Sequence, residues 1–276
     1  MLKTDVTAYL LQGLGLNSAS FIVTVYGDVV VPRGGVLWTG TLIGICERVG
    51  LNESLVRTAV SRLVAAQRLR GERAGRRSYY RLDASARREF DQAAALLFAP
   101  DIAPRGWQIL HVPGLTAEKA RQMRMGHMGG QVFLRPDRGQ PPPDGALVFH
   151  AADPAAPAEL AQFWDLSALQ AGYRAVIARF APLESLRCEA LSDGDALVAR
   201  LLLVDVYRNV VLRDPRLPQA VLPSDWQGHA ARALFRRLYR RLSPAAERHV
   251  AARFEGVDGR LPATTPESEA RLAGLG

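Results

Sequence analysis

The stretch from Leu51 to Leu82 constrains this chain most, because a helical pattern is followed at once by an arginine-rich hairpin pattern. Asn52 is a good N-cap for a helix that extends to about Ala66. At 100° per residue, the apolar side chains fill one half of the helical wheel: Leu55, Val56, Ala59, Val60, Leu63 and Val64. The opposite half is polar and holds Ser54, Arg57, Thr58 and Ser61, with Arg62 at its edge. The sequence therefore predicts a helix that buries one face and presents short hydroxyls and arginines on the other.

The residues after this helix predict two strands, Leu69–Arg73 and Arg76–Leu82, joined by a turn at Ala74-Gly75. Tyr79 and Tyr80 alternate faces, so one packs against the domain and the other is exposed or lies near phosphate. A polar-faced helix followed by a basic hairpin is typical of a winged helix-turn-helix, in which the helix enters the major groove and the wing contacts the backbone or minor groove. The alternative is a helix and a hairpin that are merely solvated.

Arginine can pair with guanine N7 and O6, and serine or threonine can contact bases or phosphates. The predicted DNA-binding residues are Ser54, Arg57, Thr58, Ser61, Arg62, Arg73, Arg76, Arg77, Ser78 and Tyr79.

The charge distribution favours the same interpretation. The chain has a formal charge of +8 and a pI near 10.1, which alone fits nucleic acid, an anionic membrane or high arginine usage. Residues 1–90 hold 13 Lys/Arg and 7 Asp/Glu, so +6 of the excess lies in the first third. Arg68 to Arg88 include eight arginines against Glu72 and Asp83. A local basic block at the predicted hairpin points to double-stranded DNA as the partner.

Bulk properties limit the remaining classes. A length of 276 residues suggests two or three domains. No apolar run reaches the ~18 residues of a membrane span, and the N-terminus lacks a signal-peptide pattern. Cys46 and Cys188 are expected to be reduced thiols in a cytoplasmic protein.

The first third predicts a DNA-binding domain over residues 1–95. A first helix, capped by Ser18 or Ser20, extends to about Val29, and Pro32–Gly35 ends it. A second helix spans about Thr39–Val49 and precedes the polar-faced helix.

The middle of the chain, residues 96–165, predicts a small α/β domain after a linker at Ala93–Ile102. Its elements are a strand at Trp107–Val112, a helix at Thr116–Met125, strands at Gln131–Leu134 and Ala146–His150, and a helix at Ala158–Trp164. This βαββα order suits a ferredoxin-like unit, interpreted here as a coupling or dimerisation domain.

The last third predicts a helical sensor domain over residues 166–255. Its expected helices are Asp165 or Ser167 to Phe180, Asp195–Leu212, Ser224 or Asp225 to Leu242, and a fourth beginning at Ser243-Pro244. Residues 256–276 are polar and rich in Pro and Gly, and are expected to be disordered. The predicted fold class is therefore α+β, mainly helical, with three domains.

Several motifs resemble the PaaX family of repressors of phenylacetic acid catabolism. The first set is Phe21–Val25 with Tyr26-Gly27-Asp28, Arg33-Gly34-Gly35, Trp38-Thr39-Gly40, Val56–Ala59, Ser61–Leu63 and Gly75–Tyr80. The second set is Tyr207-Arg208, Leu212–Pro215, Leu217-Pro218, Leu222-Pro223, Asp225-Trp226 and Gly228. The resemblance implies a homodimer that represses from an inverted-repeat operator and is released by an aryl-CoA thioester such as phenylacetyl-CoA. It also implies a middle domain similar to the Cas2 nuclease fold.

An acyl-CoA effector requires cationic groups for its phosphates and an aromatic slot for its acyl group. The candidate ligand-binding residues are Arg174, Tyr207, Arg208, Arg213 and Trp226, which could equally pack between helices. The family often carries a histidine shortly before the Tyr-Arg pair, where this chain has Asp205. An acid would be unfavourable beside a phosphate, so the effector could be a different metabolite, or the protein could respond to none.

No pattern predicts an enzyme, a metal site or a bound cofactor. Nuclease chemistry needs carboxylates around Mg²⁺, but the end of the first middle strand reads Leu110-His111-Val112-Pro113. HxxxH, CxxC, phosphate-loop and GxSxG patterns are missing from the sequence. A transcriptional regulator is the preferred interpretation, with a ligand-independent DNA- or RNA-binding protein and an enzyme acting on acyl-CoA or nucleic acid as the rivals.

Overall fold

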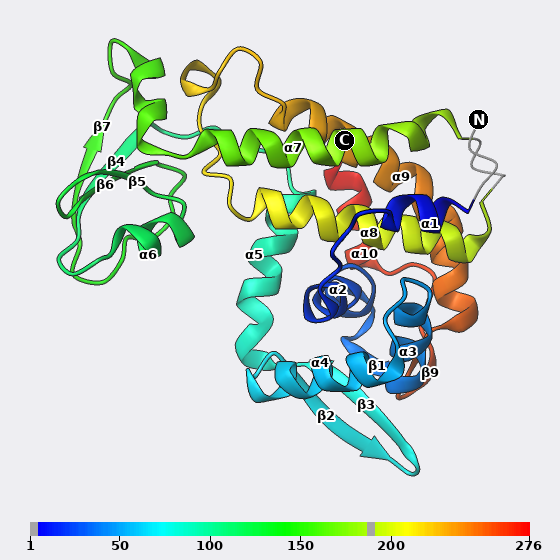
Figure 1. The fold of residues 1–276 in the computed structure, drawn as a ribbon. Coiled ribbons are helices and arrows are strands. Elements are labelled where there is room, and N and C mark those ends of the chain that lie inside the picture. The colour runs from blue at the N-terminus through cyan, green and yellow to red at the C-terminus, as the bar shows by residue number, and fades with distance from the viewer. Residues whose placement is uncertain (1–4, 187–190) are drawn as a thin grey trace. The chain divides into compact units, whose positions relative to one another are not determined.

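The structure is a computed structural model that describes residues 5–186 and 191–276, so the prediction for Cys188 lies outside the described residues. The chain forms two compact units (Figure 1). Unit 1 comprises the residues up to Pro100 together with 176–208 and 232–276, and unit 2 comprises 101–175 and 209–231. These units differ from the three ranges expected from the sequence, because parts of the last third belong to the same unit as the first third. The class is α+β, mainly helical, with antiparallel sheets, as expected.

The first third of the chain, which belongs to unit 1, contains helices and a small sheet in the predicted order. Its elements are α1 (Val6–Leu11), α2 (Ser18–Val25), a π-helical turn (Tyr26–Val30), a 3-10 turn (Val31–Arg33), β1 (Val36–Trp38), α3 (Thr39–Glu47), α4 (Glu53–Ala65), β2 (Leu69–Ala74) and β3 (Arg77–Leu82). Asn52 caps α4 as expected, since its side chain accepts the Leu55 N–H at 2.9 Å. The cap of α2 is Asn17 rather than Ser18 or Ser20, and its side chain accepts the Ser20 N–H.

The hairpin belongs to a three-stranded antiparallel sheet with the order β1-β3-β2. Strand β1, which was not expected from the sequence, pairs Leu37 with Tyr80 and Trp38 with Tyr79. Gly75 takes a left-handed φ of 60° directly after β2, as the first central residue of a two-residue hairpin loop can. Strand β2 therefore ends one residue later than expected and β3 begins one residue later, with Arg76 in the turn itself.

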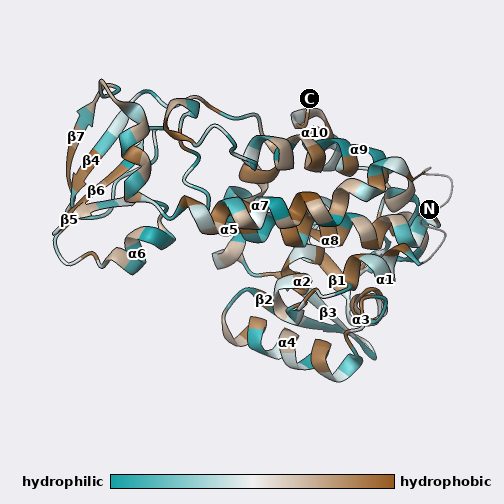
Figure 2. Cartoon of the chain, turned by 45° about the horizontal axis from the view of Figure 1, so that its top comes forward, coloured by the Kyte–Doolittle hydropathy of each residue, from teal (hydrophilic) through white to brown (hydrophobic). Residues whose placement is uncertain are grey.

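The remaining helices and short strands outside the middle sheet correct two expectations. The elements are α5 (Arg87–Phe98), α7 (Leu166–Phe180), a 3-10 turn (Ala181–Ser185), α8 (Asp193–Val211), a 3-10 turn (Gln219–Val221), α9 (Gly228–Arg253), β8 (Glu255–Gly256), β9 (Gly259–Arg260) and α10 (Pro266–Gly274). The expected linker at 93–102 is largely helix α5, because Phe90, Leu96 and Leu97 give it an apolar face. The two helices expected around Pro244 are a single helix, α9. Figure 2 shows the hydrophobic middle of α8, where Leu201 to Val204 are all buried.

The expectation of a disordered tail is wrong. Thr265 and Ser268 form a reciprocal capping box at the start of α10, and Leu275 is 1% exposed. The Arg33 side chain donates to the carbonyls of Pro262 (2.9 Å) and Ala263 (2.7 Å). These buried contacts offset the high Pro and Gly content on which the expectation depended.

Unit 2 is built on a four-stranded antiparallel sheet with the order β5-β6-β4-β7. The elements are β4 (Trp107–His111), α6 (Ala117–Gln122), β5 (Gly126–Gly129), β6 (Val132–Pro136), β7 (Leu147–Ala151) and a 3-10 helix, η4 (Pro157–Phe163). Leu110 and Phe133 form a core with Ala120 at α6, so this helix covers one face of the sheet. Strand β5 was missed because its sequence is glycine-rich, and the helix expected at 158–164 is a 3-10 helix.

Candidate nucleic-acid interface

Helix α4 presents the polar face that the sequence predicted. The exposed residues are Ser54, Arg57, Thr58, Ser61 and Arg62. The buried residues are Val56, Ala59, Val60 and Leu63. Two expected core residues, Leu55 and Val64, are 48% and 37% exposed, because each lies about 90° from the centre of the buried stripe. The helix is therefore held by a narrow apolar stripe and leaves a wide outer face accessible.

Arg57 is paired on this face with an acid of its own helix. Its guanidinium lies 2.6 Å from Glu53, one turn earlier, and both side chains are more than half exposed. An exposed pair of this kind stabilises a helix by only about 0.3–0.5 kcal/mol. Arg57 can therefore leave Glu53 for a stronger acceptor at small cost.

The hairpin carries arginines in two different states. Arg73 and Arg76 are exposed, and within the described part of the chain no carboxylate lies within 4 Å of either guanidinium. Arg77 is instead held by the protein, since its guanidinium lies 4.5 Å from the Trp38 ring centre and 2.7 Å from Glu255. A hydrogen bond with Tyr79 and the charge of Glu255 raise the pKa of Arg77.

Tyr79 does not belong to the exposed surface. It is 6% exposed, whereas Ser78 and Tyr80 on either side are half-buried. The alternation along β3 turns its ring inward, which leaves little of Tyr79 for the predicted contact with DNA. The structure leaves the other nine predicted residues at least partly accessible on α4 and the hairpin.

A buried ionic network lies behind this surface in unit 1. Arg200 of α8 contacts Asp28 at 3.0 Å and Glu247 at 2.7 Å, and its side chain is fully buried. Tyr239 donates to Asp28 at 2.7 Å, and Arg33 pairs with Glu247. Burial opposes the charge of Arg200, but the two carboxylates raise its pKa overall. The network joins the segment that follows α2 to α8 and α9 through two guanidiniums and two carboxylates.

Asp205 makes a second link between α8 and α2. Its carboxylate accepts hydrogen bonds from the hydroxyls of Ser20 and Thr24, both at 2.8 Å. Arg208 donates to the Ser20 hydroxyl at 2.9 Å, and the Tyr207 ring stacks on Phe235 with centroids 4.5 Å apart. Asp205, an acid that would be unfavourable beside a phosphate, is thus a partner of two hydroxyls on α2.

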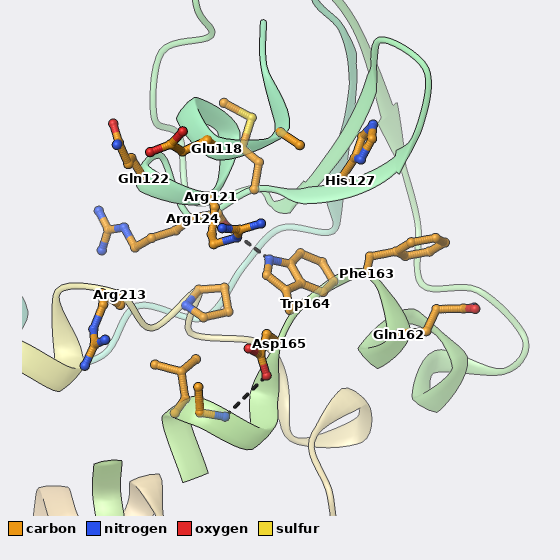
Figure 3. Close-up of a pocket in the computed structure, with 15 residues that line it drawn as sticks. Glu118, Arg121, Gln122, Arg124, His127, Gln162, Phe163, Trp164, Asp165 and Arg213 are labelled. Atoms are coloured by element: carbon orange, nitrogen blue, oxygen red, sulfur yellow. Dashed lines mark hydrogen bonds between the residues drawn. The ribbon is translucent and has the colours of Figure 1, made fainter. Parts of the chain in front are cut away.

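The five candidate effector residues are divided between the units. Tyr207 and Arg208 make the interior contacts of unit 1 described above. In unit 2, Arg174 pairs with Asp225 at 2.7 Å, and Trp226 is 8% exposed. Arg213 is exposed and lines a cavity of about 660 Å³ (Figure 3).

Residues 5–186 and 191–276 contain no group of three His, Cys, Asp or Glu side chains placed to hold a metal ion. In the same residues, no helix has both the length and the apolar composition needed to cross a membrane. Cys46 is buried in unit 1. Its burial, and to a lesser extent the charge of the nearby Glu47, raise the pKa of its thiol to about 12.

Comparison with known proteins finds matches for both the N-terminal and the C-terminal part of the chain. The family model described as PaaX-like protein covers residues 17–86, and that described as PaaX-like protein C-terminal domain covers 164–252. The chain is 32% identical over 288 aligned positions to the Transcriptional repressor PaaX of Escherichia coli (strain K12), spanning 94% of this chain and 91% of that protein. The chain belongs to the PaaX family. The family resemblance that the sequence motifs indicated is thereby confirmed.

The first PaaX match contains Asp28, Arg33 and the α4–hairpin surface, and the second contains Arg200 and Glu247. Each matched range therefore supplies one side of the buried network. Among solved structures, the uncharacterized protein Rv0674 from Mycobacterium tuberculosis aligns with a TM-score of 0.49 and 22% identity, over 75% of this chain and 88% of that one.

Proposed function

We propose that the protein is a transcriptional repressor that binds DNA through a winged helix-turn-helix formed by α2, α3, α4 and the β2–β3 hairpin. The observation that best supports this proposal is the exposed polar face of α4. It is followed directly by a hairpin whose Arg73 and Arg76 lack acidic partners among the described residues. The Escherichia coli relative is a repressor, which places this chain among regulators and not among enzymes.

In this proposal α4 lies in the major groove. Arg57 exchanges Glu53 for a guanine edge, while Ser54, Thr58 and Ser61 contact bases or phosphates. Arg62, Arg73 and Arg76 neutralise phosphates, which gives affinity without sequence preference. The DNA-binding domain is then residues 1–95.

The protein is proposed to act as a homodimer on an inverted repeat, with one recognition helix for each half-site. The range 96–165 is proposed as a ferredoxin-like dimerisation or coupling domain. Its strand order, with the first strand of the unit (β4) between the third and fourth, is that of a βαββαβ unit and supports this assignment. As a bacterial regulator it would act in the cytoplasm, at the nucleoid.

An aryl-CoA thioester such as phenylacetyl-CoA is the proposed releasing effector, sensed by residues 166–255. Such a ligand shifts DNA affinity only if it binds the DNA-competent and DNA-incompetent arrangements unequally. The links from α8 to α2 are suited to couple a change in the C-terminal helices to the DNA-binding face.

A second candidate function is that of a PaaX-family regulator whose DNA binding is controlled by a different metabolite or by none. The observation in its favour is that Tyr207 and Arg208, two of the expected effector ligands, are already engaged by Phe235 and Ser20.

A mobility-shift assay with DNA from the gene's own upstream region tests both candidates. The expected result is a specific complex that phenylacetyl-CoA dissolves and that free CoA or phenylacetate leaves intact. A complex indifferent to the thioester would favour the second candidate. Absence of any specific complex at moderate salt would contradict the DNA-binding proposal.

A further inference from the structure

A cavity of about 660 Å³ in unit 2 is lined by three arginines and two aromatic residues (Figure 3). On one side it is lined by α6 and the start of β5. On the other side it is lined by η4 and the start of α7. We call it the arginine pocket, after Arg121, Arg124 and Arg213; its aromatic wall is Phe163 and Trp164. Its volume falls within the ~300–1,000 Å³ of small-molecule sites.

The arginines of this pocket are not neutralised by ion pairs. Within residues 5–186 and 191–276, no carboxylate lies within 4 Å of their guanidiniums, although Arg174 and Arg216 of the same unit each pair with an aspartate. The two acids that line the pocket stand at helix N-termini. Glu118 is in the first turn of α6, and Asp165 accepts the Ala168 N–H at the start of α7. Their charges are therefore favourable to the helix ends, and the guanidiniums remain available for an anion.

The backbone at Arg124 is unusual for an arginine. Its φ is +62°, and it directly follows the last turn of α6, where Met125 donates back to the Ala120 carbonyl at 2.9 Å. Glycine normally occupies this left-handed position because it adopts the conformation without steric cost. Arg124 accepts an unfavourable backbone conformation while its side chain lines the pocket. Backbone strain of this kind is concentrated at binding sites.

The aromatic wall is fixed in place beside these cations. The Trp164 indole donates to the Arg124 carbonyl at 3.2 Å (Figure 3). Gly126 lies directly beneath the ring, since a Cβ there would come within 2.8 Å of Trp164. The pocket thus combines a flat apolar surface with guanidinium groups.

We propose that the arginine pocket binds a metabolite that carries phosphate at one end and a flat apolar group at the other. Arg121 and Arg124 hold the phosphate, Arg213 adds a third cation to the lining, and the apolar group packs on Trp164. That this ligand regulates DNA binding rests on the proposed function; that it binds here does not. Of the five effector residues expected from the sequence, this site uses Arg213 alone. Most of its lining belongs to residues 96–165, so the pocket extends the proposed sensor beyond the range 166–255.

The test is calorimetric titration of the full chain with phenylacetyl-CoA, CoA and phenylacetate. Arg121→Ala and Arg124→Gly are each expected to weaken thioester binding roughly ten- to hundredfold, through loss of a charged hydrogen bond. Trp164→Leu is expected to weaken the thioester and leave CoA unchanged. The matched control is Arg105→Ala, which removes the same charge from an exposed site of unit 2 outside the pocket and should change nothing.

Arg124→Gly separates binding from folding, because glycine relieves the left-handed backbone at φ +62°. Its unfolding midpoint should equal or exceed that of the wild type while its affinity falls. Equal affinity in all variants would overturn the pocket assignment and leave the effector proposal intact. No thioester binding by the wild type would overturn both, whereas operator binding by the unliganded variants would still report on DNA recognition alone.

Discussion

The arginines at the hairpin tip and those inside unit 1 are the same residue type in opposite environments. Arg73 and Arg76 are exposed and, in the described residues, without a carboxylate partner. Arg33 and Arg200 have side chains at 0% exposure and share the carboxylates of Asp28 and Glu247. The net charge of +8 therefore includes cations of two kinds. Solvation, and not residue type, decides which of them can meet a phosphate.

The cost of desolvation explains the difference. A buried guanidinium has lost its water, and acceptors of the protein, here the carboxylates of Asp28 and Glu247, must replace it. An exposed one keeps its water, which DNA phosphates displace together with released counterions. The two sets should consequently respond to mutation in separate assays: the interior set in unfolding and the hairpin set in DNA binding.

The largest expected effect is at Arg200. Arg200→Ala leaves Asp28 buried without its ionic partner, and should lower the free energy of unfolding by about 3–5 kcal/mol. Urea denaturation followed by circular dichroism measures it. Arg76→Ala, the matched exposed control, should stay within about 0.5 kcal/mol of the wild type. Similar unfolding midpoints for the two variants would show that the network contributes no such stability.

The next effect is on the operator. Arg57→Ala should weaken specific binding by about 1–3 kcal/mol and relax the base preference, because a guanine contact is lost. Fluorescence anisotropy on operator and on random duplex gives both affinities. An equal loss of affinity on the two duplexes would mean that Arg57 contacts phosphate rather than a base, as is proposed for Arg76.

A smaller effect should separate two neighbours in the hairpin. Arg76→Ala should weaken all DNA similarly and reduce the salt dependence by about one ion. Arg77 is already engaged by Trp38 and Glu255, so Arg77→Ala should reduce the salt slope less. Binding measured across a series of salt concentrations compares them. Identical slopes would mean that Arg77 leaves Glu255 when DNA binds.

The sequence was sufficient for α4 and the hairpin, because local signals specify them. Asn52 caps the helix through its own side chain, and the alternation of β3 is readable residue by residue. The network was missed, since Asp28, Arg200 and Glu247 are far apart in sequence and meet only through tertiary packing. One signal was available: Arg200 interrupts an apolar run from Ala196 to Val204, and a cation there requires a buried partner.

The arginine pocket was hidden for a related reason. Arg121 and Arg124 look like the basic last turn of a short helix, which is an ordinary surface feature. Only the backbone conformation of Arg124 and the position of Trp164 beside it mark the site. The ordered tail was also unreadable, because the buried Arg33 that holds Pro262 and Ala263 belongs to another part of the chain.

The smallest effect tests whether Arg57 belongs with the free cations. If Arg57 must leave Glu53 to reach DNA, Glu53→Gln removes a competing acceptor and a negative charge near the phosphates, so operator affinity should rise about twofold. Anisotropy at low salt resolves this, with Glu159→Gln in unit 2 as a charge-matched control. A fall in affinity would mean that Glu53 holds Arg57 in its DNA-binding geometry. Arg57 would then resemble the interior arginines, because a carboxylate would position it while it contacts DNA.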